Sequence, residues 1–555
     1  MSTLNGYEYI ATYGDLIRAF GPNRAAGEAH YFGSGLAEGR RQGFDSLQYL
    51  ASYRDLAFAF GLNLDAAAIH YITAGVNEGR AWDLFDAERY LANYSDLRAA
   101  FGTDLEAATR HYVTSGAREG RSAGSVEAYF AADTPGDGYE LWRLGPDGQA
   151  TPAAFLGAGV DGSLPDNFAS FGGLFYFTAE TATWGRELWR IGGGAPAAIV
   201  ADINPGSAGA GAYGLTEFGG ELYFGAYNDA SGYELWMVRG DGAVVQAAEI
   251  APGAGSSLPS EFTHYNGELY FTADNGSSGF ELWKVRGNGA VVQVADIAPG
   301  AASSDPHGLI QYNGILYFAA NDGSVGNEVW AVGPGGTAYL AADIAAGDSS
   351  PNDFAICAGE LYFSAERADI GREIWKIGAT GVAQLVVDLD PGARGSSPYG
   401  FTELSGEVFF AADTAGSGTE VWKVRADGAV VQVSDIAAGA ANADPGDFTV
   451  VGSELYFSAE SAATGRELYK VNAGGGVTRV ADLMPGAASS DPVDLTVFRG
   501  ELYFTADSPG AGSELHKVTS SGRVVVASDI AGGGADSSPY GLTPHGIPDP
   551  GDLLF

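Results

Sequence analysis

A Gly-x-Glu triplet recurs nine times along this 555-residue chain at an almost constant interval. Successive glutamates are 47 residues apart, with a single interval of 45. They are Glu140, Glu187, Glu234, Glu281, Glu328, Glu373, Glu420, Glu467 and Glu514. A fixed period of about 20–50 residues is typical of repeat architectures, in which each unit packs mainly against its neighbours. The sequence therefore predicts a repeat array over most of the chain in place of one compact core.

Each unit of the array contains four candidate strands. In the fourth unit they are Glu268–Ala273, Glu281–Val285, Val291–Ile297 and Gly308–Tyr312, and Asn288-Gly289 is a hairpin-turn signal between two of them. Four antiparallel strands in about 45 residues, repeated in register, are the pattern of a β-propeller. We predict a mainly β protein in which residues 125–555 form a propeller of nine, or eight, four-stranded blades.

Two irregular units are expected to meet where the ring closes. The first unit is degenerate in its third strand, at Phe155-Leu156-Gly157, and the ninth has Pro544 in its fourth strand. Proline cannot donate to a strand ladder and is confined to edges or ends of strands. The terminal Asp552–Phe555 is predicted to be able to add a strand there.

A second, shorter array occupies residues 1–124. Its three units each begin with a Tyr-rich segment and end in Glu-Gly-Arg, and apolar residues recur within them at helical intervals. Repeated residues mark the register: Asp15, Asp55 and Asp96; His30, His70 and His111; Gly21, Gly61 and Gly102. We predict two short helices per unit, with these glycines at helix C-termini. This small all-α domain is expected to serve for docking or attachment, and its histidines to be structural.

The charge balance restricts the class of partner. Lys and Arg total 29 against 69 Asp and Glu, a net charge of −40. Nucleic acids and anionic membrane surfaces both need cationic protein surfaces, so neither is an expected partner. The single cysteine, Cys357, excludes a disulfide framework and a cysteine-based zinc site. The chain also begins without a basic and then apolar segment typical of a cleaved secretion signal.

The Glu-Leu-Trp segments resemble a known repeat. Glu234-Leu235-Trp236 and Glu281-Leu282-Trp283, with a loosely kept Asp241-Gly242 and Gly335-Gly336-Thr337, are similar to the ELWxxDGT repeat of bacterial surface and secreted proteins. The resemblance spans about residues 125–545 and implies a propeller-like fold, but no single activity. The helical units, and the terminal Asp552-Leu553-Leu554-Phe555, resemble features of proteins exported by type I secretion. They imply an extracellular or cell-surface location, with a phage-like particle as the alternative.

Two residue types recur at one position in nearly every unit. The first is a tryptophan, which we interpret as packing between adjacent blades: Trp142, Trp189, Trp236, Trp283, Trp330, Trp375 and Trp422, replaced by Tyr469 and His516. The second is an acid after the third strand: Asp202, Glu249, Asp296, Asp343, Asp388, Asp435, Asp482 and Asp529. A carboxylate of this kind can accept backbone hydrogen bonds from the following turn. A ring of Ca²⁺ sites built on the aspartates is the alternative, although each unit supplies one carboxylate and calcium takes several oxygen ligands. No cofactor is otherwise expected.

Ligand recognition is expected where the units differ. The residue between the Gly and the Glu varies, and so does the loop before it. The candidate ligand-binding residues are Trp184, Arg186, Tyr227, Tyr233, Phe280 and Arg372. Aromatic rings beside polar groups suit a polysaccharide, neutral or weakly charged in view of the chain's acidity, or a protein surface.

Catalytic motifs are missing from the sequence. It contains no His-Glu-x-x-His and no phosphate-binding loop, and no catalytic residue is proposed. We therefore expect a non-enzymatic recognition and adhesion protein whose propeller binds a saccharide or surface partner and whose helical repeats anchor it to a larger assembly. The alternatives are a glycan lyase or hydrolase, and a spike or fibre of a phage-like particle or surface layer that binds capsule polysaccharide.

Overall fold

The computed structural model describes residues 4–546 apart from 77, 79, 81, 119–120, 122–125, 146–147, 158, 193–194, 473–474 and 520, and the side chains of 92, 93, 95, 96, 99 and 126. The predicted terminal strand at Asp552–Phe555 and the side chain of Asp96 lie outside the described residues. The chain forms two compact units. The first comprises 1–127, 145–147 and 544–555, and the second 128–144 and 148–543. No described helix is long and apolar enough to cross a membrane.

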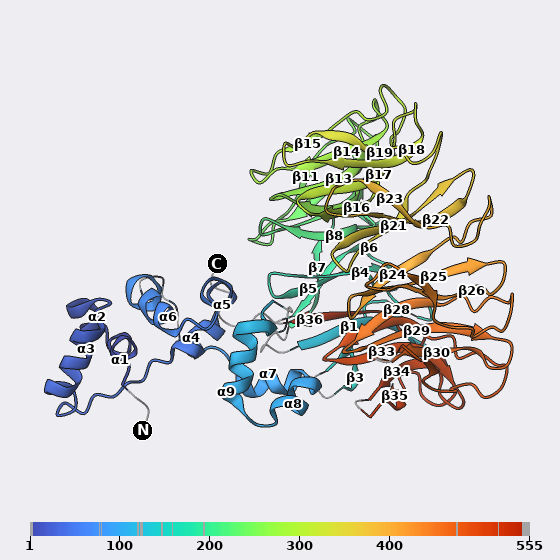
Figure 1. Ribbon diagram of the computed structural model, residues 1–555. Coiled ribbons are helices and arrows are strands. Elements are labelled where there is room, and N and C mark those ends of the chain that lie inside the picture. The colour runs from blue at the N-terminus through green and yellow to red at the C-terminus, as the bar shows by residue number, and fades with distance from the viewer. Residues whose placement is uncertain are drawn as a thin grey trace. The chain divides into compact units, whose positions relative to one another are not determined.

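The helical unit contains three similar repeats (Figure 1, blue). Each has three short helices and a closing π-helical turn, so the prediction of two helices per repeat is wrong. Repeat 1 holds α1 (Gly6–Thr12), α2 (Gly14–Phe20), α3 (Arg24–His30) and η1 (Tyr31–Gly35); repeat 2 holds α4 (Ser46–Ser52), α5 (Arg54–Phe60), α6 (Leu64–His70) and η2 (Tyr71–Gly75); repeat 3 holds α7 (Ala87–Asn93), α8 (Ser95–Phe101), α9 (Leu105–His111) and η3 (Tyr112–Gly116).

Capping residues explain why the sequence breaks into helices of seven residues. Asn5, Asp45 and Asp86 accept backbone N–H bonds at the start of the first helix of each repeat. Gly21, Gly61 and Gly102 end the second helix with φ between 51° and 59°, which confirms their predicted C-terminal position.

A tyrosine–histidine pair lies at the centre of each repeat. The hydroxyl of Tyr9 is 3.1 Å from Nδ1 of His30, and the equivalent pairs are Tyr49–His70 at 3.0 Å and Tyr90–His111 at 2.9 Å. All three tyrosines are fully buried. These hydrogen bonds join the first and third helices within each repeat, which fits the predicted structural role of the histidines.

Within the described residues, the strands of the second unit form nine four-stranded sheets, the blades of a β-propeller (Figure 1). This confirms the mainly β propeller prediction with nine blades, one more than the usual range of about four to eight. From the innermost strand outward, blade 1 is β36 (Tyr540–Gly546), β1 (Val126–Thr134), β2 (Gly138–Leu144), β3 (Ala150–Ala154); blade 2 is β4 (Asp166–Phe171), β5 (Leu174–Thr181), β6 (Gly185–Gly192), β7 (Ala195–Ala201); blade 3 is β8 (Tyr213–Phe218), β9 (Glu221–Asn228), β10 (Gly232–Val238), β11 (Val244–Ala248).

The remaining blades follow the same order. Blade 4 is β12 (Ser260–Tyr265), β13 (Glu268–Asp274), β14 (Phe280–Val285), β15 (Val291–Gln293); blade 5 is β16 (His307–Tyr312), β17 (Ile315–Asn321), β18 (Asn327–Val332), β19 (Ala338–Ala342); blade 6 is β20 (Asn352–Cys357), β21 (Glu360–Arg367), β22 (Gly371–Ile377), β23 (Ala383–Val387); blade 7 is β24 (Tyr399–Leu404), β25 (Glu407–Thr414), β26 (Gly418–Val424), β27 (Val430–Gln432); blade 8 is β28 (Gly446–Val451), β29 (Glu454–Ser461), β30 (Gly465–Val471), β31 (Val477–Arg479); blade 9 is β32 (Val493–Phe498), β33 (Glu501–Ser508), β34 (Gly512–Val518), β35 (Val524–Ser528).

The blade is offset by one strand from the sequence unit. Strand Gly308–Tyr312, predicted as the fourth strand of unit four, lies in β16 and is the innermost strand of the next blade. The same offset closes the ring, because β36 from the end of the chain pairs with β1 near the start of the propeller. The two irregular units therefore do meet at the closure, as predicted.

Aromatic and aliphatic residues of adjacent blades form the hydrophobic cores. One such core joins Tyr317 and Val329 of blade 5 to Phe363 and Trp375 of blade 6. Trp375 is 6% exposed, which fits the prediction that the repeated tryptophan packs between blades. Because each blade buries its faces only against its neighbours, the ring is expected to unfold cooperatively.

Candidate functional site

The glutamate of the Gly-x-Glu triplet is completely buried in all nine blades. The Glu281 carboxylate accepts hydrogen bonds from the backbone N–H groups of Ile297 at 2.8 Å and Ala298 at 3.1 Å. Burial raises the pKa of this carboxyl group, and the hydrogen bonds that it accepts act in the opposite direction. For Glu187 burial raises the pKa to about 7. These carboxylates fasten the segment after the fourth strand to its own blade, which is a structural role.

Two arginines of the predicted ligand-binding set are engaged with the backbone of their own blades. The Arg186 guanidinium donates to the carbonyl of Leu164 at 2.9 Å and to Thr178 Oγ1 at 3.2 Å. Arg372 does the same in blade 6, with the carbonyl of Ser350 at 2.9 Å and Ser364 Oγ at 3.2 Å. Both side chains thus hold the chain segment that enters the innermost strand.

The aromatic members of that set are spread over three blades. Tyr227 and Tyr233 are cross-strand partners in blade 3, with ring centroids 5.1 Å apart. Trp184 lies on the hairpin between β5 and β6 of blade 2 and is 36% exposed, and Phe280 begins β14 of blade 4 and is half-buried. The structure brings together only the two tyrosines, and a binding role for the set stays a prediction.

The acids predicted after the third strand of each sequence unit follow the outermost strand of each blade. Three of them, Glu249, Asp435 and Asp529, accept hydrogen bonds from the turn that follows. Oδ1 of Asp202 and Oδ1 of Asp388 are buried without a hydrogen-bond partner among the described residues. Asp529 accepts from the N–H groups of Gly532 at 3.0 Å and Gly533 at 3.2 Å, and Asp435 accepts from Gly439 at 3.3 Å. Among the described residues, no group of three or more His, Cys, Asp or Glu is placed to hold a metal ion. These contacts favour the turn-capping interpretation of the repeated acid, and a calcium role stays untested.

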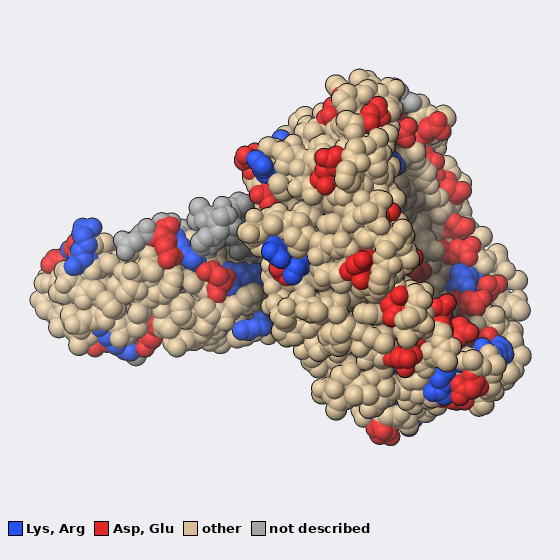
Figure 2. All heavy atoms as spheres, turned by 90° about the horizontal axis from the view of Figure 1, so that it is seen from above, with Lys and Arg blue, Asp and Glu red and all other residues tan. Residues whose placement is uncertain are grey.

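The innermost strands carry a set of exposed carboxylates that the sequence analysis did not single out. They contain no Lys or Arg, and seven acids: Asp166, Glu217, Glu261, Asp353, Glu403, Asp447 and Asp494. None of the seven forms an ion pair with another described residue. Although its side chain is exposed, partial loss of solvation among the inner strands raises the pKa of Asp447; the negative charge of Asp494 in the next blade raises it further, and Arg466 acts in the opposite direction. We call this set the inner acidic ring; red carboxylates are likewise spread over the propeller face in Figure 2.

An alternation between neighbouring blades accompanies the inner acidic ring. Glycines Gly214, Gly308, Gly400 and Gly541 alternate with Glu261, Asp353, Asp447 and Asn167 at the same strand position, and all of these residues have positive φ. The alternation breaks once, because Asp494 of blade 9 follows Asp447 of blade 8. A Cβ on Gly214 would lie 2.9 Å from the ring of Phe262 in the next blade. Glycine therefore makes room for the phenylalanine that follows each acid or amide, and this pattern was readable in the sequence.

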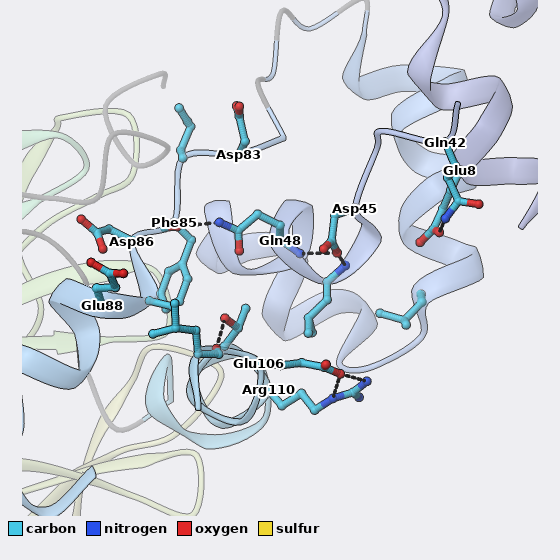
Figure 3. Close-up of a pocket in the computed structure, with 16 residues that line it drawn as sticks. Glu8, Gln42, Asp45, Gln48, Asp83, Phe85, Asp86, Glu88, Glu106 and Arg110 are labelled. Atoms are coloured by element: carbon cyan, nitrogen blue, oxygen red, sulfur yellow. Dashed lines mark hydrogen bonds and ion pairs between the residues drawn. The ribbon is translucent and has the colours of Figure 1, made fainter. Parts of the chain in front are cut away.

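The helical unit contains a groove of about 1200 Å³, lined by residues of all three repeats (Figure 3). Its acidic lining is Glu8, Asp45, Asp83, Asp86, Glu88 and Glu106, with Arg110 as the basic residue. Leu64, Leu84 and Leu105 add apolar surface between the acids. The groove is larger than a typical small-molecule site of about 300–1,000 Å³. No single repeat holds enough of this lining to reveal the groove in the sequence.

The carboxylates of the groove differ in what they already bind. Asp45 caps helix α4 through the N–H groups of Leu47 and Gln48, and Glu106 pairs with Arg110 at 2.9 Å. Asp83 and Glu88 are exposed and form no hydrogen bond or ion pair with a described residue. These two side chains are therefore available to a ligand.

Comparison with known proteins finds similarity only in fold. No family model matches the chain, and no curated protein matches it. Among solved structures, a puromycin hydrolase is 16% identical with a TM-score of 0.33, over 62% of this chain and 58% of that one. A dipeptidyl peptidase 4 of Porphyromonas gingivalis is 12% identical with a TM-score of 0.40, over 66% of this chain and 59% of that one. A prolyl endopeptidase structure is 12% identical with a TM-score of 0.35, over 64% and 54%.

These comparisons contradict the expectation of a non-enzymatic recognition and adhesion protein. The solved structures that share the propeller are named as peptidases and a hydrolase, and the chain spans less than two thirds of their length. The expectation relied on the absence of contiguous motifs, which is weak ground because catalytic groups come from positions far apart in the sequence. At 12–16% identity the likeness concerns the fold and assigns no activity to this chain.

Proposed function

We propose that the helical unit binds an extended polypeptide segment rich in Lys and Arg, and that this segment lies in the acidic groove across the three repeats. The observation that carries the proposal is the groove lining of six carboxylates and one guanidinium. Such a surface attracts cations and repels polyanions.

The apolar part of the lining favours a polypeptide over a simple cation. Leu64, Leu84 and Leu105 lie between the acids, and Leu105 is 39% exposed. Lys and Arg have long aliphatic stems that pack on apolar surface while their charged ends reach a carboxylate. A segment of alternating basic and apolar residues would use both parts of the groove.

Two carboxylates are expected to contribute most to the binding. Asp83 and Glu88 can accept hydrogen bonds from a ligand without giving up a bond to any other residue that the structure describes. Asp45 and Asp86, in contrast, cap the starts of α4 and α7, so pairing with a ligand competes with helix capping. The inner acidic ring of the propeller has the same sign of charge and favours the same class of partner.

Fluorescence anisotropy with the full chain tests the proposal. A labelled peptide of alternating Lys, Arg and Leu should bind, a matched peptide with Glu in place of Lys and Arg should not, and binding should weaken as salt approaches about 0.3 M. The Asp83→Asn/Glu88→Gln variant should bind about two- to thirtyfold more weakly, because two exposed ion pairs are lost.

The matched control removes two exposed acids of the propeller, in the Glu180→Gln/Glu366→Gln variant. Its affinity should equal that of the wild type. Equal binding of the basic and acidic peptides, or an unchanged affinity of the Asp83→Asn/Glu88→Gln variant, would reject the groove as the site. Mass spectrometry of the peptide after incubation shows whether the bound segment is also cleaved.

A further inference from the structure

The buried glutamate of blade 2 lacks a hydrogen bond that its equivalents in the other blades have. In those eight blades a serine hydroxyl donates to the carboxylate. The serines are Ser163, Ser257, Ser304, Ser349, Ser396, Ser434, Ser490 and Ser537. No hydroxyl of a described residue donates to Glu187, which accepts from backbone N–H groups, those of Ile203 at 3.3 Å and Asn204 at 3.2 Å.

Two alanines account for the missing donor. The serine usually lies 23 residues after the glutamate. Blade 7 has Ala443 at that position, and Ser434, 14 residues after its glutamate, supplies the hydroxyl instead. Blade 2 has Ala210 and Ala201 at these two positions. A hydrogen bond to a carboxylate favours its ionised form, so the loss of the hydroxyl affects the ionised form most.

The segment that Glu187 holds, residues 203–210, also joins blade 2 to the hairpin between β9 and β10 of blade 3. Three hydrogen bonds make this junction, which we call the blade 2–3 contact. They run from Asn228 Nδ2 to the Ile203 carbonyl at 2.6 Å, from the Asp229 N–H to Asn204 Oδ1 at 3.0 Å and from the Tyr227 N–H to the Ala210 carbonyl at 2.8 Å. A movement of segment 203–210 would therefore reach blade 3.

We propose that the blade 2–3 contact is a pH-responsive device, in which loss of the Glu187 proton near neutral pH opens segment 203–210 and releases the hairpin of blade 3. A protonated carboxyl group is neutral and tolerates burial in the blade. An ionised one that lacks its hydroxyl donor is stabilised by reaching water, and opening of the segment gives it that access.

The surroundings of Glu187 agree with this behaviour. Burial raises its pKa to about 7, and the negative charge of Asp202 raises it further. Toward blade 1, the core around its cross-strand partner Ala179 is apolar. Asp229 of the blade 3 hairpin is also acidic, and the neighbouring Arg186 donates to a backbone carbonyl. Glu187 forms no ion pair with another residue that the structure describes, so no cation there stabilises its ionised form.

Hydrogen exchange of the full chain, followed by mass spectrometry, tests the proposal. The open segment has the ordinary glutamate pKa of 4.5, so opening becomes more favourable as the pH rises from there to about 7. After correction for the intrinsic exchange rate, the protection of segment 203–210 should fall by about tenfold or more between about pH 5 and pH 8. Segment 297–304 of blade 4, where Glu281 has its serine, is the internal control and should lose less protection.

Serine substitutions provide the decisive variants. Ala210→Ser introduces the hydroxyl at the position used in most blades, and Ala201→Ser introduces it at the position used in blade 7. Either variant should keep segment 203–210 protected at about pH 8. Glu187→Gln, which cannot ionise, should abolish the pH dependence. In blade 4, Ser304→Ala should transfer the same pH dependence to segment 297–304.

Circular dichroism spectra show which variants are folded. The proposal would be overturned by equal protection of segment 203–210 in the wild type at both ends of the pH range. It would also be overturned if the folded serine variants lost protection as the wild type does. The Ser304→Ala variant tests the same principle without altering blade 2, and an unchanged pH dependence of segment 297–304 would show that the serine hydroxyl does not control opening.

Discussion

The carboxylate of Glu281 accepts a hydrogen bond of 2.7 Å from the hydroxyl of Ser304, which lies 23 residues further along the chain. The same pair recurs, for example, as Glu234 with Ser257 at 2.8 Å and Glu467 with Ser490 at 2.7 Å. A buried carboxylate needs hydrogen-bond donors at fixed positions. The backbone supplies Glu281 with two further donors, the N–H groups of Ile297 and Ala298. The almost constant interval between the triplets therefore reflects the length of chain that each carboxylate must hold.

Replacing Glu281 by Ala should lower the free energy of unfolding by about 2–5 kcal/mol, because two backbone N–H groups and a serine hydroxyl would be left buried without an acceptor. Chemical denaturation followed by tryptophan fluorescence measures the change. The Glu180→Ala variant, at an exposed position, serves as the control and should unfold like the wild type. A loss of stability no larger than that of the control would show that the Glu281 network is dispensable.

The pH dependence of stability should include a contribution from Glu187. Burial raises its pKa to about 7 in the folded chain, above its ordinary value of 4.5. Its contribution is therefore fully present below about pH 4.5 and is lost as the pH rises through 7. We therefore compare the free energy of unfolding of the wild type with that of Glu187→Gln. Between about pH 5 and pH 8, the window that these two pKa values define, the wild type should lose stability relative to the variant.

Comparison with Glu187→Gln is needed because other buried groups act in the opposite direction. Burial lowers the pKa of His516 and of His545, so their contributions increase as the pH rises. The difference between the two proteins cancels these shared effects. If the difference in free energy of unfolding between the two proteins stays constant from about pH 5 to pH 8, the pH dependence does not come from Glu187.

The Gly214→Ala substitution should destabilise the propeller more than Gly219→Ala. Both glycines have positive φ, 69° and 63°, so both variants incur backbone strain of about 1 kcal/mol. Only at Gly214 would the new Cβ also meet the Phe262 ring at 2.9 Å, whereas nothing lies within 4 Å at Gly219. Thermal unfolding of the two variants measures the added cost of the contact, and equal melting temperatures would show that Phe262 moves aside freely.

Arg186→Ala should lower the melting temperature, while Trp184→Ala should leave it nearly unchanged. The Arg186 guanidinium satisfies the Leu164 carbonyl, and loss of such charge-assisted bonds costs about 1–3 kcal/mol. Trp184 is partly exposed on a hairpin; its backbone N–H donates to Thr181, and its indole ring forms no hydrogen bond with another described residue. Differential scanning calorimetry of both variants separates the two roles. Equal stability of the Arg186→Ala variant and the wild type would return Arg186 to the candidate ligand-binding residues.

The local sequence was sufficient for the strands and the propeller fold, because the alternation of Glu268–Asp274 and the hairpin turns depend on neighbouring residues. It left eight or nine blades open, since closure of the ring depends on the pairing of β36 with β1. It did not predict three helices in each repeat, since a seven-residue helix such as Arg24–His30 is too short to show a clear helical period. Arg186 also has a partner that the local sequence did not reveal. Its variability between units predicted a ligand-binding role, which stays a prediction, and its contact with the carbonyl of Leu164 joins residues 22 apart in the sequence.

A ring of repeated blades with a small helical array can be predicted from the residues alone, because burial within each unit follows from short-range patterns of apolar residues, glycine and acids. The one-strand offset that closes the ring depends on long-range packing, since β36 and β1 come from opposite ends of the propeller sequence. Long-range packing also forms the acidic groove, where Glu8, Asp83 and Glu106 come from different repeats. Surfaces of this kind depend on distances between residues remote in sequence, and packing alone fixes those distances.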